Sequence, residues 1–198
     1  MARYTRPVMQ SPTLLETSRL LLRPFQESDA IDLAVILSDP EVMRHVGQGN
    51  PKTFEETVNY LQYLLRHEAA YGFSLRAMVR KEDDRMIGQC GLWHLEKTGE
   101  VSLAYTLAQD CWGDGYATEA SIAWLDYGFN SGLKPEQVHG LDLHRIVAIS
   151  KPENGASIRI LEKLGMHYER DDEFYHCNCA YYGLSRDQWN DFRSGSQV

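Results

Sequence analysis

Two glycines lie where a strand pattern gives way to a helical pattern, and this junction limits most strongly what the chain can fold into. In the segment LAQDCWGDGYATEASIAWLDYGF, Gly113 and Gly115 follow an alternating pattern that ends near Leu107. A helical pattern begins after them, near Ala117 or Thr118. Glycine allows positive φ and close approach of a ligand, and the free amides of a first helical turn favour an anion. The junction therefore predicts a pyrophosphate-binding loop.

Two common phosphate-binding motifs do not fit this junction. A P-loop requires a Lys-Ser or Lys-Thr pair after its glycines, and neither pair follows here. A dinucleotide fingerprint needs a third small residue where Thr118 stands, and a preceding strand that opens a βαβ unit. The strand before the loop belongs instead to an expected antiparallel meander. Another kind of phosphate-bearing ligand is favoured.

Length and charge restrict the class of protein. With 198 residues and 43% hydrophobic composition, the chain suits one domain with a sizeable core. No stretch approaches the roughly 18 apolar residues of a membrane span, and MARYTRPVMQSPTLLETSR lacks a signal-peptide core, so we expect a cytoplasmic protein without membrane contact. The formal net charge of -8 is spread along the chain, which argues against nucleic-acid binding and mildly favours a cationic substrate.

The cysteines do not indicate a metal or a disulfide framework. No Cys-x-x-Cys pair occurs among Cys90, Cys111, Cys177 and Cys179. His176 with Cys177 and Cys179 could be imagined as metal ligands, but alternate residues of a strand share one face and explain the spacing without metal. We therefore expect reduced structural thiols and no metal site.

Periodicity gives a coarse order of elements. TSRLLLRPFQ reads as an edge strand, and a helix follows with Ser28 as the expected N-cap. A longer helix should begin at Thr53, which forms a capping-box pair with Glu56, and end at Gly72. GFSLRAMVR, RMIGQCGLW and EVSLAYTLA then read as three sequential antiparallel strands. DDEFYHCNCAYYGLS should supply the last hairpin.

WGDGYATEA, a helix, and LHRIVAISKPENGASIRILEKLGM together resemble the GCN5-related N-acetyltransferase (GNAT) superfamily, in its RimJ/RimL-like branch. The resemblance runs from LETSRLLLRPFQESDA to YYGLSRDQW. It implies an α/β fold with a mixed, mainly antiparallel twisted sheet of about six to seven strands and helices on both faces. We expect an extension over residues 1–12, the acetyltransferase domain over residues 13–192, and a flexible tail over residues 193–198.

The superfamily signature Gln/Arg-x-x-Gly-x-Gly/Ala falls on residues 112–117, with Trp112 where Gln or Arg is usual. The resemblance implies that loop amides from Gly113 to Thr118 hold the pyrophosphate of acetyl-CoA. It also implies that a strand pairs with the pantetheine arm. The cofactor-binding residues expected on this ground are Tyr105, Thr106, Leu107, Trp112, Gly113, Asp114, Gly115, Tyr116, Ala117, Thr118 and Asn154.

The second motif, PENGASIRILEKLG, contains Asn154 and Ser157. Asn154 reads as an N-cap, with Gly165 at the helix stop, and the resemblance adds a contact with pantetheine. Leu161 stands where many acetyltransferases carry a Tyr that protonates the leaving thiolate. The resemblance names Ser157 as the substitute, and an ordinary first-turn serine is the equal alternative.

These expectations lead to direct transfer of acetyl from acetyl-CoA to a primary amine. The amine must be neutral, the carbonyl oxygen needs a donor such as a strand amide near Leu107, and the thiolate benefits from a proton. The spacing selects no general base among Glu100, Tyr105, His94 and His144.

A protein N-terminus is the leading acceptor. A small amine (a polyamine, an aminoglycoside or an amino-acid derivative) and a non-catalytic acyl-CoA sensor are the alternatives. The sequence leaves open whether the protein is a monomer or a homodimer. It also leaves open whether residues 131–143 form a substrate-side loop, a dimer-side loop or a neutral insertion.

Overall fold

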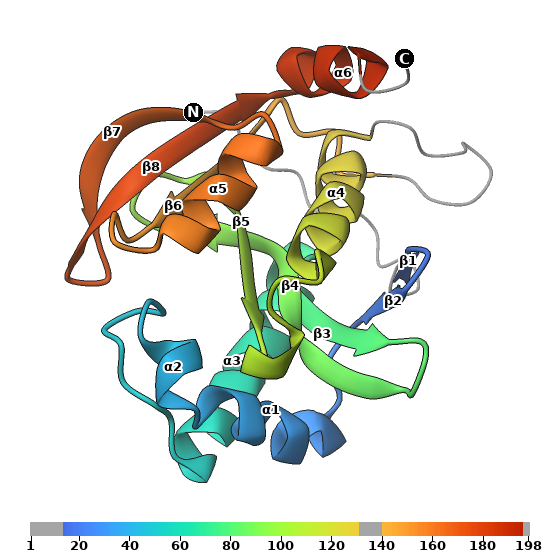
Figure 1. Ribbon diagram of the computed structural model, residues 1–198, viewed down its shortest axis with the longest axis vertical. Coiled ribbons are helices and arrows are strands. Elements are labelled where there is room, and N and C mark those ends of the chain that lie inside the picture. Colours follow the sequence, from blue (N-terminus) through green and yellow to red (C-terminus); the bar gives the residue numbers. More distant parts are fainter. Residues whose placement is uncertain (1–13, 131–139, 196–198) are drawn as a thin grey trace.

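One eight-stranded sheet runs through residues 14–130 and 140–195, which are the residues that the computed structural model describes (Figure 1). The strand order is β1-β2-β3-β4-β5-β6-β8-β7. Neighbouring strands are antiparallel except for the parallel pair β5–β6. The strands are β1 (Leu15–Glu16), β2 (Leu20–Arg23), β3 (Leu75–Arg80), β4 (Arg85–Leu95), β5 (Glu100–Leu107), β6 (Arg145–Ser150), β7 (His167–Phe174) and β8 (Cys177–Ser185). The expected mixed, mainly antiparallel sheet is confirmed, with the two-residue β1 as an additional strand.

Helices cover both faces of the sheet. They are α1 (Ala30–Leu37), α2 (Pro40–Met43), α3 (Phe54–Tyr71), α4 (Tyr116–Phe129), α5 (Gly155–Lys163) and α6 (Arg186–Gly195), with short 3-10 turns at Glu27–Asp29 and Gln109–Cys111. On β4, Gln89 bonds Tyr60 of α3, whereas the thiol of the next residue, Cys90, lies 4.0 Å from Ser121 of α4. Successive strand residues point to opposite faces. Therefore α3 covers one face, called here the α3 face, and α4 covers the other, the α4 face.

The helix ends follow local chemistry with one exception. In α3, the Thr53 hydroxyl accepts the Glu56 amide, the Glu56 carboxylate accepts the Thr53 amide, and Gly72 ends the helix at φ +80°. The expected N-cap at Ser28 is wrong. Ser28 lies inside a 3-10 turn, because the carboxylate of Asp29 bonds back to the Gln26 amide and tightens the chain there.

The parallel pair β5–β6 has one feature that determines the site. Of the described residues, only Ser102 and Val147 form a bridge between these strands, whereas β4 pairs with β5 along its whole length, from Gly88↔Leu107 to Leu95↔Glu100. The two strands therefore separate beyond Ser102. We call the space between Leu103–Leu107 of β5 and Ala148–Ser150 of β6 the slot.

Several expectations concern residues outside the described ranges. Residues 1–13, 131–139 and 196–198 lie outside them, so the expected extension over residues 1–12 and most of the segment 131–143, whose role the sequence left open, are not described. Helix α6 continues to Gly195, so residues 193–195 are helical where the sequence indicated a flexible tail.

Candidate active site

The loop between β5 and α4 has the backbone geometry that its glycines predicted. Gly113 and Gly115 both have positive φ, at +87° and +82°. Helix α4 begins at Tyr116, with Gly115 itself as the left-handed N-cap and without a side-chain cap bond. The helix thus starts one or two residues earlier than expected. Its first-turn amides are not capped by a side chain, which suits an anionic ligand.

The side chains of the loop turn away from these amides. Trp112 donates its indole N–H to the carbonyl of Leu107, at 3.0 Å, and closes the loop against the end of β5. Tyr116 and Ala117 are buried in the core. These positions thus offer their backbone to a ligand, and Trp112 takes a structural role where the signature usually has a polar residue.

The three residues directly before β2 hydrogen-bond Glu119 in the first turn of α4. Glu119 Oε1 accepts hydrogen bonds from the Thr17 hydroxyl (2.5 Å), the Ser18 hydroxyl (3.1 Å) and the Arg19 amide (2.9 Å). Burial opposes ionisation of Glu119, but these hydrogen bonds and one from the Arg19 side chain outweigh it and hold its pKa below the usual value. The carboxylate therefore stays charged in the first turn of α4, where the helix dipole also favours it.

Arg19 brings positive charge to the loop. Its guanidinium bonds the Asp114 carbonyl at 3.0 Å, pairs with Glu119 at 2.6 Å, and lies 4.4 Å from the centre of the Tyr116 ring. Sequence reasoning missed Arg19 and Glu119 because 100 residues separate them. An acidic residue in the first turn of the expected helix was the one available signal for a cationic partner.

The direction of the backbone groups of β5 follows from its ladder with β4. In an antiparallel pair, the N–H and C=O groups of successive residues point to alternate neighbours. The Ala108 amide donates to the Ile87 carbonyl at 2.9 Å, which fixes the phase of this alternation. Leu103, Tyr105 and Leu107 therefore direct their backbone groups into the slot. Thr106 directs its groups to Gln89 of β4, so it is not placed to pair across the slot through its backbone.

The start of α5 faces Tyr105 from the α4 side of the sheet. The Asn154 side chain accepts the Ser157 amide at 3.1 Å, as the expected N-cap does. The Tyr105 hydroxyl lies 3.1 Å from the Ser157 hydroxyl and 3.3 Å from its carbonyl. Burial raises the pKa of Tyr105 above its usual value, so the phenol keeps its proton at neutral pH. The structure thus brings Tyr105, Asn154 and Ser157 together beside the slot.

Of the four groups considered as general bases, Tyr105 lies beside the slot but keeps its proton, and the other three are placed differently. Glu100 accepts hydrogen bonds from Arg145, at 3.0 Å, and from the Tyr181 hydroxyl. The ring of His94 stacks on Tyr71 at 4.8 Å, and its Nδ1 is buried without a hydrogen-bond partner. His144 is exposed. None of these arrangements resembles a base aimed into the slot.

The described part of the chain contains no metal-binding cluster and no membrane-spanning helix. All four cysteines are free, and no group of three or more His, Cys, Asp or Glu side chains placed to hold a metal occurs within residues 14–130 and 140–195. Within the same ranges, no helix is both long and apolar enough to cross a membrane.

Comparison with known proteins assigns the chain to a family. The description of the matching family is "Acetyltransferase (GNAT) domain", and the match covers residues 19–167. YkkB of Bacillus subtilis, described as an uncharacterized protein, is 37% identical over 166 residues, which cover 82% of this chain and 90% of that protein.

Solved structures agree on the fold. A GNAT-family acetyltransferase from Bacillus anthracis superposes with a TM-score of 0.73 at 25% identity, covering 88% of this chain and 99% of that one. A RimL ribosomal L7/L12 alpha-N-protein acetyltransferase in complex with coenzyme A has a TM-score of 0.71, covering 88% and 99% of the two chains. At 16% identity this second likeness shows the fold alone.

Proposed function

Because the chain belongs to the GNAT acetyltransferase family and is therefore an N-acetyltransferase, we propose that it passes acetyl from acetyl-CoA to an α-amino group, with a protein N-terminus as the leading acceptor. The observation that carries this proposal is the slot. The described strands β5 and β6 share a single bridge and then diverge, which leaves the edge of β5 unpaired. This edge lies directly before the loop of Gly113 and Gly115 and the start of α4.

The residues around the slot fit acetyl-CoA part by part. Backbone groups of Tyr105 and Leu107 point into the slot beyond the bridge, where the amides of a pantetheine arm can bond them as an added strand does. Loop amides from Gly113 to Thr118 suit the pyrophosphate, with the Arg19 guanidinium beside them. Bound there, acetyl-CoA would supply the thioester carbonyl.

The chain would contribute donors to the transfer. The Leu107 amide points into the slot and can hydrogen-bond a carbonyl oxygen as it becomes negative. Ser157 holds a hydroxyl proton beside the slot, and the protonated Tyr105 phenol lies within hydrogen-bond distance of it. We infer that Ser157 protonates the leaving thiolate as the C–S bond breaks and regains a proton from the nitrogen that has formed the new amide bond, with Tyr105 orienting its hydroxyl. Asn154 positions Ser157 through the cap bond.

The acceptor preference follows from the described residues, among which we identify no strong base at the slot. An α-amino group has a pKa of about 7.7 to 8.0, so a good part of it is neutral near neutral pH, whereas a lysine-like amine near 10.4 needs a strong base. Glu100, the carboxylate considered for that role, is occupied by Arg145 and Tyr181. The description of the RimL neighbour as an alpha-N-protein acetyltransferase points the same way.

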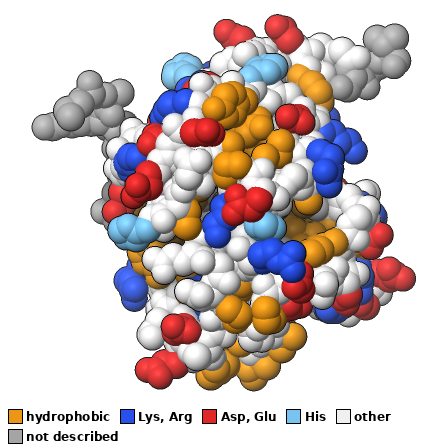
Figure 2. Space-filling view, turned by 60° about the vertical axis from the view of Figure 1, so that its left-hand side comes forward, with side chains coloured by type: hydrophobic (Ala, Val, Ile, Leu, Met, Phe, Trp, Pro, Cys, Tyr) orange, Lys and Arg blue, Asp and Glu red, His pale blue; other side chains and the backbone are white. Residues whose placement is uncertain are grey.

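A small cationic amine is the second candidate, favoured by the formal net charge of -8. Figure 2 shows the surface from the side on which β7 and β8 lie, where hydrophobic side chains appear between acidic and basic ones. Such a surface can receive an acceptor with both a charge and an apolar part.

The test is a panel of N-terminal peptides and small amines screened for release of coenzyme A. We expect the highest kcat/KM with an α-amino peptide, and a kcat about 10²-fold lower in Ser157→Ala. A polyamine as the best acceptor would favour the second candidate. Acetyl-CoA binding without turnover on any amine would instead favour a non-catalytic sensor.

A further inference from the structure

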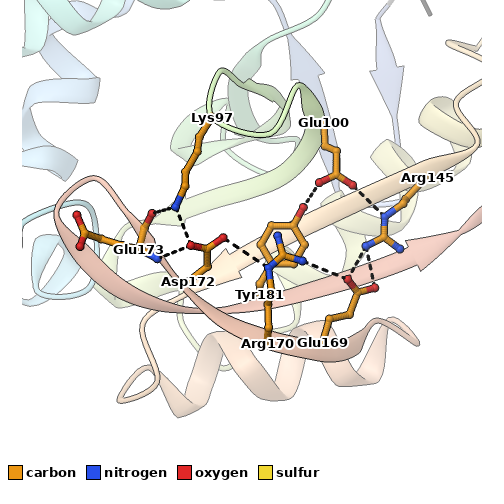
Figure 3. A network of polar contacts seen from close by, with 8 residues as sticks. All are labelled: Lys97, Glu100, Arg145, Glu169, Arg170, Asp172, Glu173 and Tyr181. Carbon is orange, nitrogen blue, oxygen red and sulfur yellow. Dashed lines mark hydrogen bonds and ion pairs between the residues drawn. The ribbon is translucent and has the colours of Figure 1, made fainter. Parts of the chain in front are cut away.

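A chain of polar contacts crosses the sheet at the closed end of the slot (Figure 3). Its residues come from the β4–β5 turn and from strands β5, β6, β7 and β8. They are Lys97, Glu100, Arg145, Glu169, Arg170, Asp172, Glu173 and Tyr181. Glu173 takes part through its backbone, and the contributing side chains of the strands lie on the α3 face. The contacts thus join four neighbouring strands, including the two that diverge.

Arg145 is the centre of this chain of contacts. Its Nε donates to Glu100 Oε1 at 3.0 Å, and its Nη2 lies 2.7 Å from both oxygens of Glu169 on β7. The second oxygen of Glu100 accepts the hydroxyl of Tyr181 on β8. One guanidinium therefore ties β5 to β6 and, across β8, to β7.

We call the contacts of Arg145 with Glu100 and Glu169 the tie. The tie lies at the point where the slot closes. Glu100 and Arg145 each stand two residues before the bridging pair, Ser102 and Val147, on their own strands. They are therefore in register with the only bridge between the described parts of β5 and β6. The strands separate on one side of the bridge, where the slot lies. The contact between Arg145 and Glu100 lies on the other side of the bridge.

Gly183 leaves room for the tie to cross β8. A Cβ added at Gly183 would lie 2.2 Å from Glu169 Oε1 and 2.5 Å from Arg145 Nη2. Gly183 pairs with Val147 and His167 in the middle of the sheet and does not have positive φ. Backbone strain therefore does not explain glycine here. The space over this residue is filled by the ion pair.

Global stability is a poor explanation of this arrangement. The side chains of Arg145 and Glu100 are 38% and 33% exposed, and ion pairs with this much solvent contribute little to the free energy of unfolding. One planar guanidinium that contacts two carboxylates instead fixes the orientation of the strands that carry them. The tie constrains the one strand pair that the backbone joins at a single point.

We propose that Arg145 is a positioning residue that sets the angle between β5 and β6, and through it the placement of the reacting groups in the slot. Glu100, Glu169 and Gly183 complete the device. Its effect on acetyl transfer rests on the proposed function, but its effect on the strands does not.

The first test measures the strands alone. Arg145→Ala should raise amide hydrogen exchange about 10-fold at Leu103 and Val147, the amides at the bridge between the strands. Even-numbered amides of β5 are bonded to β4 and should stay protected. Arg193→Ala, which removes an arginine of similar exposure from its ion pair between α6 and Asp126 of α4, is the control and should leave both sets unchanged. Unchanged exchange at Leu103 and Val147 in Arg145→Ala would overturn the proposal.

The second test measures transfer. We expect Arg145→Ala to lower kcat about 10-fold with little change in the acetyl-CoA Kd or in Tm, because misplaced reacting groups slow chemistry more than binding. Arg145→Lys should recover only part of kcat, since a single ammonium cannot fork between two carboxylates. Wild-type kcat in Arg145→Ala, or a parallel loss of kcat, affinity and Tm, would contradict a positioning role.

Gly183→Ala keeps every charged group and separates the remaining explanations. Alanine normally stabilises a strand relative to glycine, so a bystander glycine predicts an unchanged or higher Tm with normal kcat. We expect a lower kcat and faster exchange at Leu103, because the methyl group displaces the tie. If the wild-type protein releases no coenzyme A with any amine, the proposed function fails, and the exchange data still decide whether the tie holds the strands.

Discussion

The two ends of β5 are held in opposite ways. At Glu100, side chains fasten the strand to β6 and β8, in addition to its ladder with β4. At Leu107, the ladder with β4 remains, and on the other side the Leu107 carbonyl accepts only the Trp112 indole from its own loop. One strand thus carries a fixed end and an open end within eight residues.

This difference shows how one strand can serve two purposes. An open strand edge offers unpaired backbone groups, which bind an extended ligand but also leave the strand free to move. Fixing the other end limits that movement to a single point of divergence. The open end is suited to binding, and the closed end sets the geometry in which bound groups meet.

The largest expected effect tests the open end. Gly115→Val should weaken acetyl-CoA binding by about 10³-fold, because displaced loop amides lose charge-assisted hydrogen bonds of about 1.5–3 kcal/mol each, and valine strongly disfavours positive φ. Gly72→Val is the matched control, since Gly72 also has φ +80° and no atom within 4 Å of an added Cβ. Calorimetry should show normal affinity in the control. Normal affinity in folded Gly115→Val would remove the pyrophosphate from this loop.

The next effect concerns the chemistry beside the open end. Ser157→Ala should lower kcat by about 10²-fold while acetyl-CoA affinity stays nearly unchanged, if its hydroxyl protonates the thiolate. Tyr105→Phe should lower kcat less, because Ser157 keeps its own proton. Steady-state kinetics and calorimetry on the two variants separate the roles. Wild-type kcat in Ser157→Ala would leave water as the proton source.

A third prediction tests the support of the closed end. His67 of α3 is buried, donates to the Phe73 carbonyl at 2.9 Å and accepts the His94 amide of β4 at 3.2 Å. Burial lowers its pKa to about 4. As pH falls, His67 is protonated in the unfolded chain before it is protonated in the folded protein. The contribution of neutral His67 to the free energy of unfolding is therefore complete above about pH 6.5 and falls as pH drops toward 4.

The loss should be at most about 3 kcal/mol in the free energy of unfolding. Urea unfolding between pH 7 and pH 4 measures it, with His67→Gln as the non-titrating comparison. If the variant and the wild type lose stability equally over this range, His67 is not the titrating group.

The smallest effect concerns the acceptor. With an α-amino acceptor and no strong base, kcat/KM should rise about 5-fold from pH 7 to pH 8 and then level off, following the neutral amine. A lysine-like acceptor should keep rising toward about pH 10. A polyamine with a rate already level at pH 7.5 would reveal a base and contradict the preference for N-termini.

Local signals in the sequence were sufficient for much of the fold. The capping box at Thr53 and Glu56, and the Asn154 cap, mark helix starts because each depends on residues within one turn. The glycine loop was recognisable because only glycine readily adopts two positive φ values so close together. Helix α4 begins earlier than expected because Gly115 is itself the cap.

The long-range contacts at the start of α4 and at the closed end of the slot were beyond such reasoning. Arg19 and Glu119 meet across 100 residues, and Arg145 meets Glu100 across 45. Both pairings depend on which strands become neighbours, and periodicity along the chain carries no such information. Nothing in the sequence next to Gly183 explains the glycine, since the space over it is filled by Arg145 and Glu169 from two other strands.

Amide hydrogen exchange on the wild-type protein with and without acetyl-CoA tests the central claim most directly. We predict strong protection at the amides of Tyr105 and Leu107 and at those of residues 113–118, with little change at the amide of Leu103, which the bridge to β6 already protects. Protection spread evenly along β5, or confined to other parts of the protein, would contradict the assignment of an open binding end and a fixed end to this strand.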